Sequence, residues 1–275
     1  MPHLDPTWQL AGLTAGALLV VAVLLGLVGW TRTAAAAREA TLVAGLYTAW
    51  QLIGTLTHRN VEGASANALT VWHAEQALHL PSELAMQQAM ISHPWLVQLA
   101  NGYYVYGHFN PIVLLLVWVF VRHRAEYARV RLLLCLLTAT AFVVHFVPVA
   151  PPRLMPQLGF RDVALEYGQS VYGSFGAGIP GQLLAMPSLH VGWAILLAYV
   201  VVTVSRSRWR WLAVLHPVAM SVDVAVTANH WWADGAVCGV LLILCIAAER
   251  AVVRVVRAVR VPTVLEPVPL EPVPA

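Results

Sequence analysis

The sequence is poor in charge and in cysteine, and it contains no lysine. Charged residues make up 11% of the chain, whereas hydrophobic residues make up 59% and the mean hydropathy is +0.70. This composition excludes an ordinary soluble domain, because too few polar side chains are available to cover its surface. All sixteen basic residues are arginine, and the small net charge of +3 gives no reason to expect a nucleic acid partner.

The three cysteines, Cys135, Cys238 and Cys245, all lie inside apolar runs. Their odd number and their spacing match neither a disulfide framework nor a zinc site. We therefore expect them to be small, buried, hydrophobic side chains.

Long apolar runs, separated by short charged segments, are what the chain has in abundance. About twenty apolar residues are enough for a helix to cross a bilayer, so the sequence predicts an all-α, polytopic membrane helical bundle. The predicted spans cover residues 8–30, 41–57, 102–121, 132–150, 188–205, 211–229 and 235–253. Between the second and third spans, residues 58–100 carry apolar side chains at helical spacing, which indicates short amphipathic helices on the membrane surface or, alternatively, a connecting loop.

The arginines predict the orientation of these spans. Thirteen lie in the segments 31–40, 122–131 and 206–210 and from residue 250 onward, whereas the remaining three are Arg59, Arg153 and Arg161. Because cytoplasmic loops are rich in positive charge, the segments 58–100, 151–187 and 230–234 are expected outside the cytoplasm. We therefore expect a multi-pass protein of the plasma membrane, with its candidate catalytic residues on the extracytoplasmic face.

Three parts of the chain are expected on this basis. Residues 1–40 would form an N-terminal transmembrane anchor and a cytoplasmic loop, because no basic residue precedes the first span and two arginines follow it. Residues 41–253 would form the catalytic membrane domain. Residues 254–275 end in a tandem LEPVP repeat, which is typical of an extended, disordered cytoplasmic tail.

Two of the outer segments carry groups that can hold phosphate. Arg153 follows two prolines, which end a helix and present a guanidinium able to bind phosphate through two hydrogen bonds. Ser188 and His190 lie at the start of a predicted helix, whose free N–H groups favour an anion. Taken singly, the arginine also fits a contact with lipid headgroups and the histidine an ordinary interfacial position.

The third outer segment contains His230 and Asp234, four residues apart. On a helix this pair shares a face, so the carboxylate can accept the Nδ1 proton and leave Nε2 with a free lone pair. Such an imidazole is a nucleophile or a base. With His190 as a second acid and base, and with Arg153 and Ser188 near the developing charge, the set fits phosphoryl transfer through a phosphohistidine. This scheme requires no metal and no cofactor.

The three segments resemble the signature motifs of the type 2 phosphatidic acid phosphatase (PAP2) superfamily, usually written KxxxxxxRP, PSGH and SRxxxxxHxxxD, over roughly residues 145–240. PSLH at 187–190 and HWWAD at 230–234 are most similar to the branch that contains inositol phosphorylceramide synthase. The resemblance implies a six-helix core over residues 41–253, to which the span at 8–30 is an addition.

The resemblance also implies a role for each residue. His230 would be the nucleophile, Asp234 the carboxylate that orients it, and His190 the acid that protonates the leaving alkoxide. Arg153 and Ser188 would hold the phosphate oxygens.

The sequence departs from the family pattern at three positions. Phe146 stands at the lysine of the first motif, Leu154 at its proline, and Val224 at the arginine of the third motif. The loss of two positive charges favours a phosphodiester or lipid-linked donor, or a transferase, over a phosphate monoester dianion.

Two further features of the apolar runs are candidates for binding. Asp223 lies within a predicted span, seven residues before His230, and an ionisable residue at that depth indicates a function. We expect it to contribute to substrate binding, by pairing with Arg153 or by contacting an acceptor hydroxyl; alternatively, it remains protonated. The stretch YYVYGHFNP at 103–111 fits an aromatic belt at the membrane interface or a polar wall around a headgroup.

The sequence therefore predicts a membrane-embedded phosphatase or phosphotransferase that acts on a lipid-linked phosphate, with water or an alcohol as the acceptor. One alternative is a non-catalytic protein that binds or translocates lipids on the same scaffold. Another is that His190, His230 and Asp234 bind a metal for hydrolysis.

Overall fold

The computed structural model describes residues 7–57, 61–170 and 182–260. Within these ranges the chain forms ten α-helices and no strand, apart from an isolated bridge between Val149 and Leu184, so the predicted all-α fold is confirmed. The α-helices are α1 (Thr7–Leu27), α2 (Thr31–Thr57), α3 (Val61–Ala77), α4 (Glu83–Ile91), α5 (Pro94–Arg122), α6 (Arg124–Val144), α7 (Val163–Glu166), α9 (Leu189–Val204), α10 (Leu215–Val226) and α11 (Trp232–Arg260). Three 3₁₀ turns are η1 (Pro152–Leu154), η2 (Pro156–Leu158) and η3 (Arg208–Val214).

Four of the described helices are long and apolar enough to cross a membrane, which identifies a multi-pass integral membrane protein. These segments are Trp8–Leu27, Pro94–Arg122, Arg124–Val144 and Trp232–Val256. The count differs from the seven predicted spans. Helix α9 is apolar but has 16 residues, and α10 has only 12 because it begins after η3. Helix α2 is long but carries Arg32, Arg38 and Glu39.

Several predicted boundaries fall inside helices. Helix α2 runs without a break through the predicted loop 31–40, because the alanine run within it favours a helix, so the predicted boundary at residue 40 lies within α2. Helix α11 continues to Arg260, past the predicted start of the tail at 254. The remainder of the predicted disordered tail, 261–275, lies outside the described residues.

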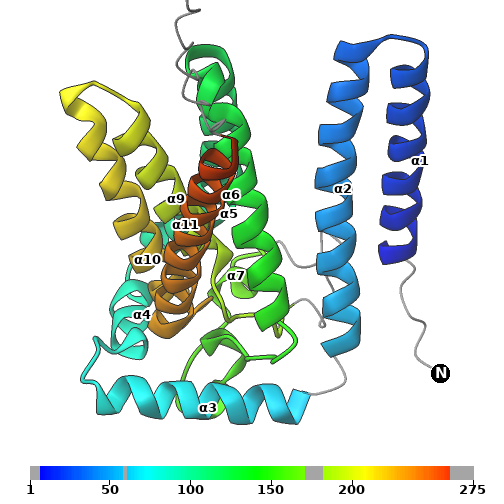
Figure 1. Ribbon diagram of the computed structural model, residues 1–275. Coiled ribbons are helices and arrows are strands. Elements are labelled where there is room, and N and C mark those ends of the chain that lie inside the picture. Colours follow the sequence, from blue (N-terminus) through cyan, green and yellow to red (C-terminus); the bar gives the residue numbers. More distant parts are fainter. Residues whose placement is uncertain (1–6, 58–60, 171–181, 261–275) are drawn as a thin grey trace, which may run out of the picture.

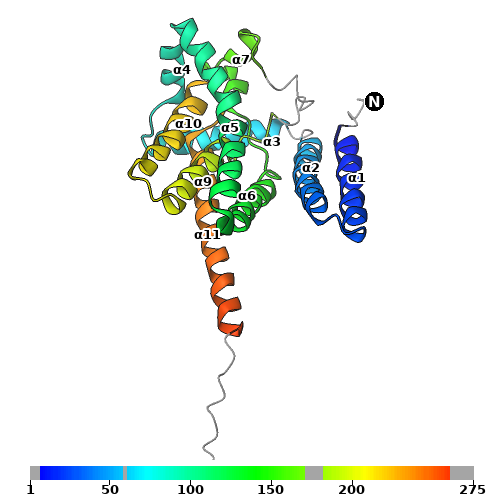
Figure 2. The same ribbon diagram turned by 90° about the horizontal axis from the view of Figure 1, so that it is seen from above.

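The helices form a bundle with a separate hairpin beside it. Helices α1 and α2 lie side by side and stand next to a bundle of α5, α6, α9, α10 and α11, and both views agree on this arrangement (Figures 1 and 2). Helix α3 lies across one end of the bundle (Figure 1). The predicted helices within 58–100 are thus confirmed as α3 and α4.

The apolar core lies between α5, α6, α9 and α11. Its buried members include Leu133, Leu196 and Leu242. Cys238 and Cys245 belong to it as predicted, whereas Cys135 is half-buried. Helices α9 and α11 approach closely at Gly192, where a Cβ atom would overlap the Cys238 sulfur. This close contact brings the first turns of α9 and α11 together.

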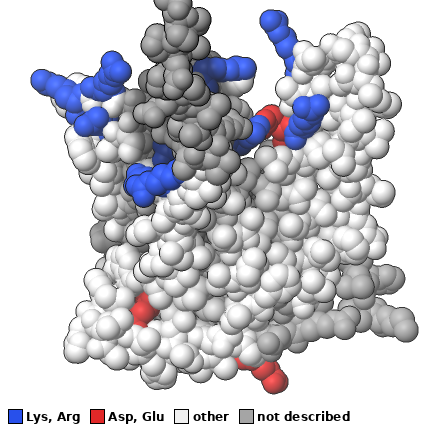
Figure 3. All heavy atoms as spheres, in the orientation of Figure 1, with Lys and Arg blue, Asp and Glu red and all other residues white. Residues whose placement is uncertain are grey.

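The two ends of the bundle differ in charge. The α1–α2 turn, the α5–α6 junction, the α9–α10 connection and the end of α11 all lie at the end opposite α3 (Figure 1). On the face shown in Figure 3, arginine side chains gather at that end. The arginine-bearing connections and the segment 58–100 therefore lie at opposite ends of the molecule.

Candidate active site

Three irregular segments meet at the end of the bundle that α3 covers. They are the residues after α6, the residues before α9, and the turn between α10 and α11. Hydrogen bonds join them: Ser188 N donates to the Asp234 carbonyl at 3.0 Å, and Trp231 Nε1 donates to the Ala150 carbonyl at 2.9 Å. The backbone of all three segments is thereby fixed in one small region.

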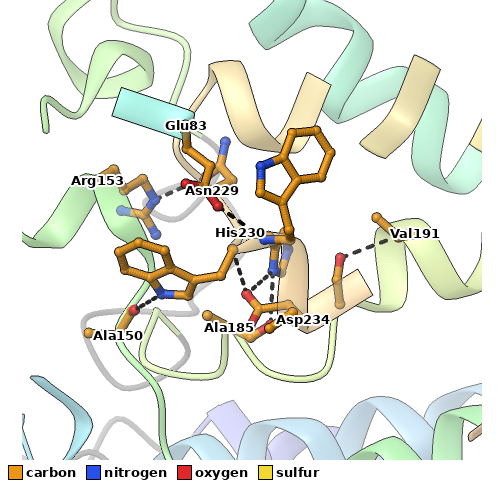
Figure 4. Close-up of polar contacts among 12 residues, drawn as sticks. Glu83, Ala150, Arg153, Ala185, Val191, Asn229, His230 and Asp234 are labelled. Carbon is orange, nitrogen blue, oxygen red and sulfur yellow. Dashed lines mark hydrogen bonds and ion pairs between the residues drawn. The ribbon is translucent and has the colours of Figure 1, made fainter. Parts of the chain in front are cut away.

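The imidazole of His230 is held through one of its two nitrogens (Figure 4). Its Nδ1 lies 2.8 Å from the Ala185 carbonyl oxygen and 3.2 Å from Asp234 Oδ2. Both neighbours are acceptors, so Nδ1 must carry the hydrogen and Nε2 keeps its lone pair. The structure therefore brings His230 and Asp234 together as predicted, and it adds Ala185 as a second partner.

Asp234 also fixes the chain around it. Its Oδ2 accepts a hydrogen bond from Trp231 N at 2.9 Å, and the residue is fully buried. Its Oδ1 has no hydrogen-bond partner among the described residues. Asp234 thus holds both the imidazole and the backbone beside it.

His190 lies in the first turn of α9, and its ring centroid is 5.5 Å from that of His230. The ring stacks on Tyr104, with centroids 4.2 Å apart, and on His108, with centroids 3.9 Å apart. His108 in turn stacks on Trp193 at 4.5 Å. These contacts fix the plane of the His190 ring beside the His230 ring.

The stretch 103–111 is thus divided between two environments. Tyr104 and His108 are buried against His190, whereas Tyr106 is 68% exposed. The predicted aromatic belt therefore describes only part of the stretch, and the buried part contributes to the wall of the site.

Ser188 caps α9 at its N-terminus. Its Oγ accepts a hydrogen bond from Val191 N at 3.4 Å, and the residue is fully buried. This is the position expected from the sequence, because serine is a favoured N-cap residue.

Arg153 reaches the site from η1, and its side chain is 1% exposed. Its Nε donates to Asn229 Oδ1 at 3.0 Å (Figure 4). Its Nη1 donates to Asp162 Oδ2 and Gln182 Oε1, each at 2.9 Å. The guanidinium is therefore held in place within the protein, and one of its partners, Asn229, directly precedes His230 in the sequence. The sequence alone did not indicate these three partners.

The turn before His230 depends on Arg153 as well. Ala228 has a left-handed backbone with φ of 54°, which is strained for a residue with a Cβ atom. The Ala228 carbonyl accepts the backbone N–H of Arg153 at 2.8 Å, while Thr227 Oγ1 accepts from Asn229 Nδ2 at 2.9 Å. These hydrogen bonds stabilise the turn that precedes His230.

Asp223 is buried in α10, and its Oδ2 has no partner among the described residues. No hydrogen bond or ion pair in the described ranges joins it to Arg153, His190 or His230. The pairing of Asp223 with Arg153 considered from the sequence is not formed, because the acidic partner of Arg153 is Asp162.

Two acidic residues at the site were not singled out from the sequence. Glu75 Oε1 accepts from Ala233 N at 2.7 Å, and Glu83 Oε1 accepts from Trp232 N at 3.2 Å (Figure 4). Both carboxyl groups are buried. The signal that could have found them is the scarcity of acidic residues in this chain, which makes each one worth explaining.

A metal site was also considered from the sequence. Over the part of the chain that the structure describes, no group of three or more histidine, cysteine or acidic side chains is arranged to hold a metal ion. His230 instead directs Nδ1 toward Asp234 and Ala185.

The sequence of the chain was compared with those of known protein families. The sequence matches the PAP2 superfamily over residues 69–248, a range that holds every hydrogen bond of the site described above. No curated protein and no solved structure matches the chain. The matched range covers more than half of the 275 residues, and the chain therefore belongs to the PAP2 superfamily.

Proposed function

We propose that this protein is a phosphatase or phosphotransferase of the membrane that acts on a lipid-linked phosphate through a phosphohistidine at His230. The observation that carries the proposal is the pair of acceptors on His230 Nδ1, Ala185 O and Asp234 Oδ2. Together they leave Nε2 unprotonated and fixed in direction, as a nucleophile requires. Membership of the PAP2 superfamily supports the same chemistry.

The reaction takes two steps. His230 Nε2 attacks the phosphorus, the bond from phosphorus to the leaving oxygen breaks, and His190 gives that oxygen a proton. Water or an alcohol then attacks the phosphohistidine, His190 takes the proton of the attacking hydroxyl, and the bond between nitrogen and phosphorus breaks. The two ring centroids are 5.5 Å apart, which is close enough for one phosphoryl group to contact both rings.

Arg153 and the start of α9 would stabilise the phosphate. Arg153 is already oriented by Asn229, Asp162 and Gln182, so binding would require little rearrangement of its side chain. The free N–H groups after Ser188 add a favourable dipole. Asp223 is assigned to the acceptor rather than to the phosphate, because its buried Oδ2 is unpaired in the described structure and a carboxylate would repel the anion.

A cavity beside the two histidines fits the apolar part of a lipid. It has a volume of about 230 Å³ and lies between α9, α10 and α11. Its lining includes Val191, next to His190, and Trp231, next to His230, together with Gly235 and Gly239. An apolar chain in this cavity would place an attached phosphate near the imidazoles.

The branch of the superfamily and the acceptor are the finer parts of the proposal. The likeness to the branch with inositol phosphorylceramide synthase rests on PSLH and HWWAD alone. An inositol acceptor is therefore one arm of the test, beside glycerol and water. Hydrolysis and transfer differ only in the nucleophile of the second step.

The direct test is phosphate release and headgroup exchange by the purified protein in detergent. The panel comprises phosphatidate, an isoprenoid diphosphate and an inositol phospholipid, each with and without added inositol or glycerol, and with and without a chelator. Release lost in His230→Ala supports a phosphatase, whereas exchange that needs the alcohol supports a phosphotransferase. Equal inertness of both proteins would instead favour lipid binding or translocation, and loss of activity with the chelator would favour a metal.

The face of the membrane needs its own test. We place the site on the extracytoplasmic face of the plasma membrane because the arginine-rich connections lie at the opposite end of the bundle. Glu62→Cys in α3 and Arg208→Cys in η3 mark the two ends. In intact cells a membrane-impermeant thiol reagent should label only Glu62→Cys. Labelling of Arg208→Cys alone would reverse the orientation.

A further inference from the structure

The first turn of α11 is held by three carboxyl groups in succession. Asp234 Oδ2 accepts from Trp231 N at 2.9 Å, Glu83 Oε1 from Trp232 N at 3.2 Å, and Glu75 Oε1 from Ala233 N at 2.7 Å. The first N–H groups of a helix have no partner within the helix, so these bonds satisfy them. Only Asp234 belongs to α11 itself, whereas Glu75 comes from α3 and Glu83 from the start of α4.

Glu75 and Glu83 cannot both be fully charged in this position without strong repulsion. Each is 4% exposed, and neither forms an ion pair with a basic side chain in the described ranges. Glu75 also lines an apolar cavity of about 530 Å³, with Leu78, Leu80 and Trp232 among its neighbours. Two adjacent buried carboxyl groups without a cation are stable when they share one proton.

We propose that Glu75 and Glu83 are positioning residues, which share one proton and hold the first turn of α11 so that Asp234 and His230 keep their geometry. The assignment of His230 and Asp234 as catalytic rests on the function proposed above. The two glutamates act through α11, because they bond to Trp232 N and Ala233 N, which lie in the segment between His230 and Asp234.

The protonation of Glu75 is consistent with this arrangement. Burial, hydrogen bonding to Glu83, and the negative charges of Glu83 and Asp234 raise the pKa of Glu75 to about 8, against which the bond from Ala233 N acts. The titratable groups that face it are therefore Glu83 from α4 and Asp234 from α11. At pH 7 Glu75 holds the proton, and above pH 8 it becomes negatively charged.

The sign of the effect on stability follows from linkage. The folded protein keeps the Glu75 proton up to about pH 8, whereas the unfolded chain releases it near its ordinary pKa of 4.5. The folded state binds more protons between these values, so the Glu75 carboxyl makes the protein less stable as the pH rises from 4.5 to 8. Above pH 8 the contribution no longer changes.

Glu75→Gln is the decisive variant. Glutamine keeps an oxygen for Ala233 N and an N–H group for Glu83, but it cannot ionise. The turnover number kcat of the wild type should fall about tenfold between pH 7.5 and 9.5, whereas that of Glu75→Gln should fall less than twofold. KM should change little, because Glu75 does not line the cavity proposed above for the lipid. Glu75→Leu, which removes the acceptor, should lose about tenfold in kcat at pH 7.

The matched control is Glu62→Gln, which removes an exposed acidic group from the first turn of the same helix. It should keep the wild-type pH profile. If Glu75→Gln also kept the alkaline fall in kcat, the shared proton would be wrong. If Glu75→Leu retained full kcat at pH 7, the positioning role would be wrong.

Thermal unfolding in detergent separates this inference from the proposed function. The difference in midpoint between wild type and Glu75→Gln should change by at least about 4 °C between pH 5 and 8, with the wild type losing stability, and should stay constant above pH 8. This readout needs no substrate. A wild type that is inert on every lipid but shows this difference would overturn the proposed function and keep the shared proton; a difference independent of pH would overturn the shared proton alone.

Discussion

An ion pair at the arginine-rich end of the bundle lies at the surface and joins two helices, whereas the buried carboxylate of Asp234 at the opposite end bonds to an imidazole and to the backbone. Arg131 and Glu39 form an ion pair in which the side chains are 39% and 37% exposed. At the other end, Asp234 is fully buried and accepts hydrogen bonds from His230 Nδ1 and Trp231 N. Acidic side chains are therefore exposed to solvent in the first case and fully buried in the second.

Charged side chains therefore have different roles at the two ends of the bundle. Exposed ion pairs contribute little free energy, but many arginines together set the orientation in the membrane. Buried carboxyl groups are stable only where donors surround them, so they fix the geometry of the backbone that carries the chemistry. Substitutions should therefore have large effects at the site and small effects at the arginine-rich end.

The largest effect should follow from His230→Ala. Loss of the proposed nucleophile should reduce phosphate release or transfer by at least about 10³-fold, because His230 is the only histidine in the described ranges that is paired with a carboxylate. The measurement is turnover on the best lipid of the panel, with thermal unfolding to show that the fold persists. The control is Arg206→Ala at the other end, which should keep full activity. A similar loss of activity in both variants would show that the two ends of the bundle do not differ in their importance for catalysis.

The next effect should come from the ion pair between Arg153 and Asp162. Arg153→Ala should lower stability by about 3 kcal/mol, because Asp162 Oδ2, Asn229 Oδ1 and Gln182 Oε1 each lose the donor that Arg153 supplies in a largely buried place. For a chain of this size the thermal midpoint should drop by about 6 to 12 °C.

A double variant separates the two roles of Arg153. Arg153→Ala with Asp162→Asn should recover part of the lost stability, because no unpaired carboxylate remains, but it should recover no activity if Arg153 also binds phosphate. Recovery of activity together with stability would show that Arg153 serves only the fold.

Asp234→Asn should have a smaller effect than either of these changes. The Ala185 carbonyl still accepts the Nδ1 hydrogen at 2.8 Å, so His230 keeps the tautomer with a free Nε2. We expect kcat to fall about 10- to 100-fold, the range found for partners that orient a metal-bound histidine through its second nitrogen, because the Ala185 carbonyl remains as an acceptor. Turnover measured beside His230→Ala checks this. An equal loss in both variants would mean that Ala185 alone does not hold the tautomer.

Much of the fold could be predicted because long apolar runs report membrane helices directly. The ends of the helices could not be predicted, since at each end helical and non-helical conformations of a few residues compete. The alanine run in α2 extends a helix through a predicted loop, and α10 starts only after η3, where the predicted span at 211–229 had already begun. Composition averages over such details, whereas helix ends are set by single residues and their partners.

The site divides in the same way. The pairing of His230 with Asp234 was expected from helical spacing, but His230 lies in the turn before α11. The contact forms because Asp234, in the first turn of α11, reaches back to His230 Nδ1. The Ala185 carbonyl could not be predicted, because a backbone atom 45 residues away leaves no mark in the sequence. Glu75 and Glu83 contact α11 from more than 140 residues away, and Arg153 finds Asp162 and Gln182 across irregular segments. Hydrogen-bond partners that only the tertiary fold brings together could not be predicted from the sequence.

The smallest effect should come from the ion pair between Arg131 in α6 and Glu39 in α2, the counterpart of Arg153 and Asp162 at the opposite end. Glu39→Gln should lower stability by about 0.5 kcal/mol, because water screens half-exposed charges and both side chains lose freedom when they pair. The thermal midpoint should therefore move by about 1 to 2 °C, less at high salt, with activity unchanged. The two scans, Glu39→Gln and Arg153→Ala, belong in the same detergent and buffer. A drop of several degrees for Glu39→Gln would show that the α1–α2 hairpin depends on this pair to stay beside the bundle, and that the arginine-rich end also holds the fold together.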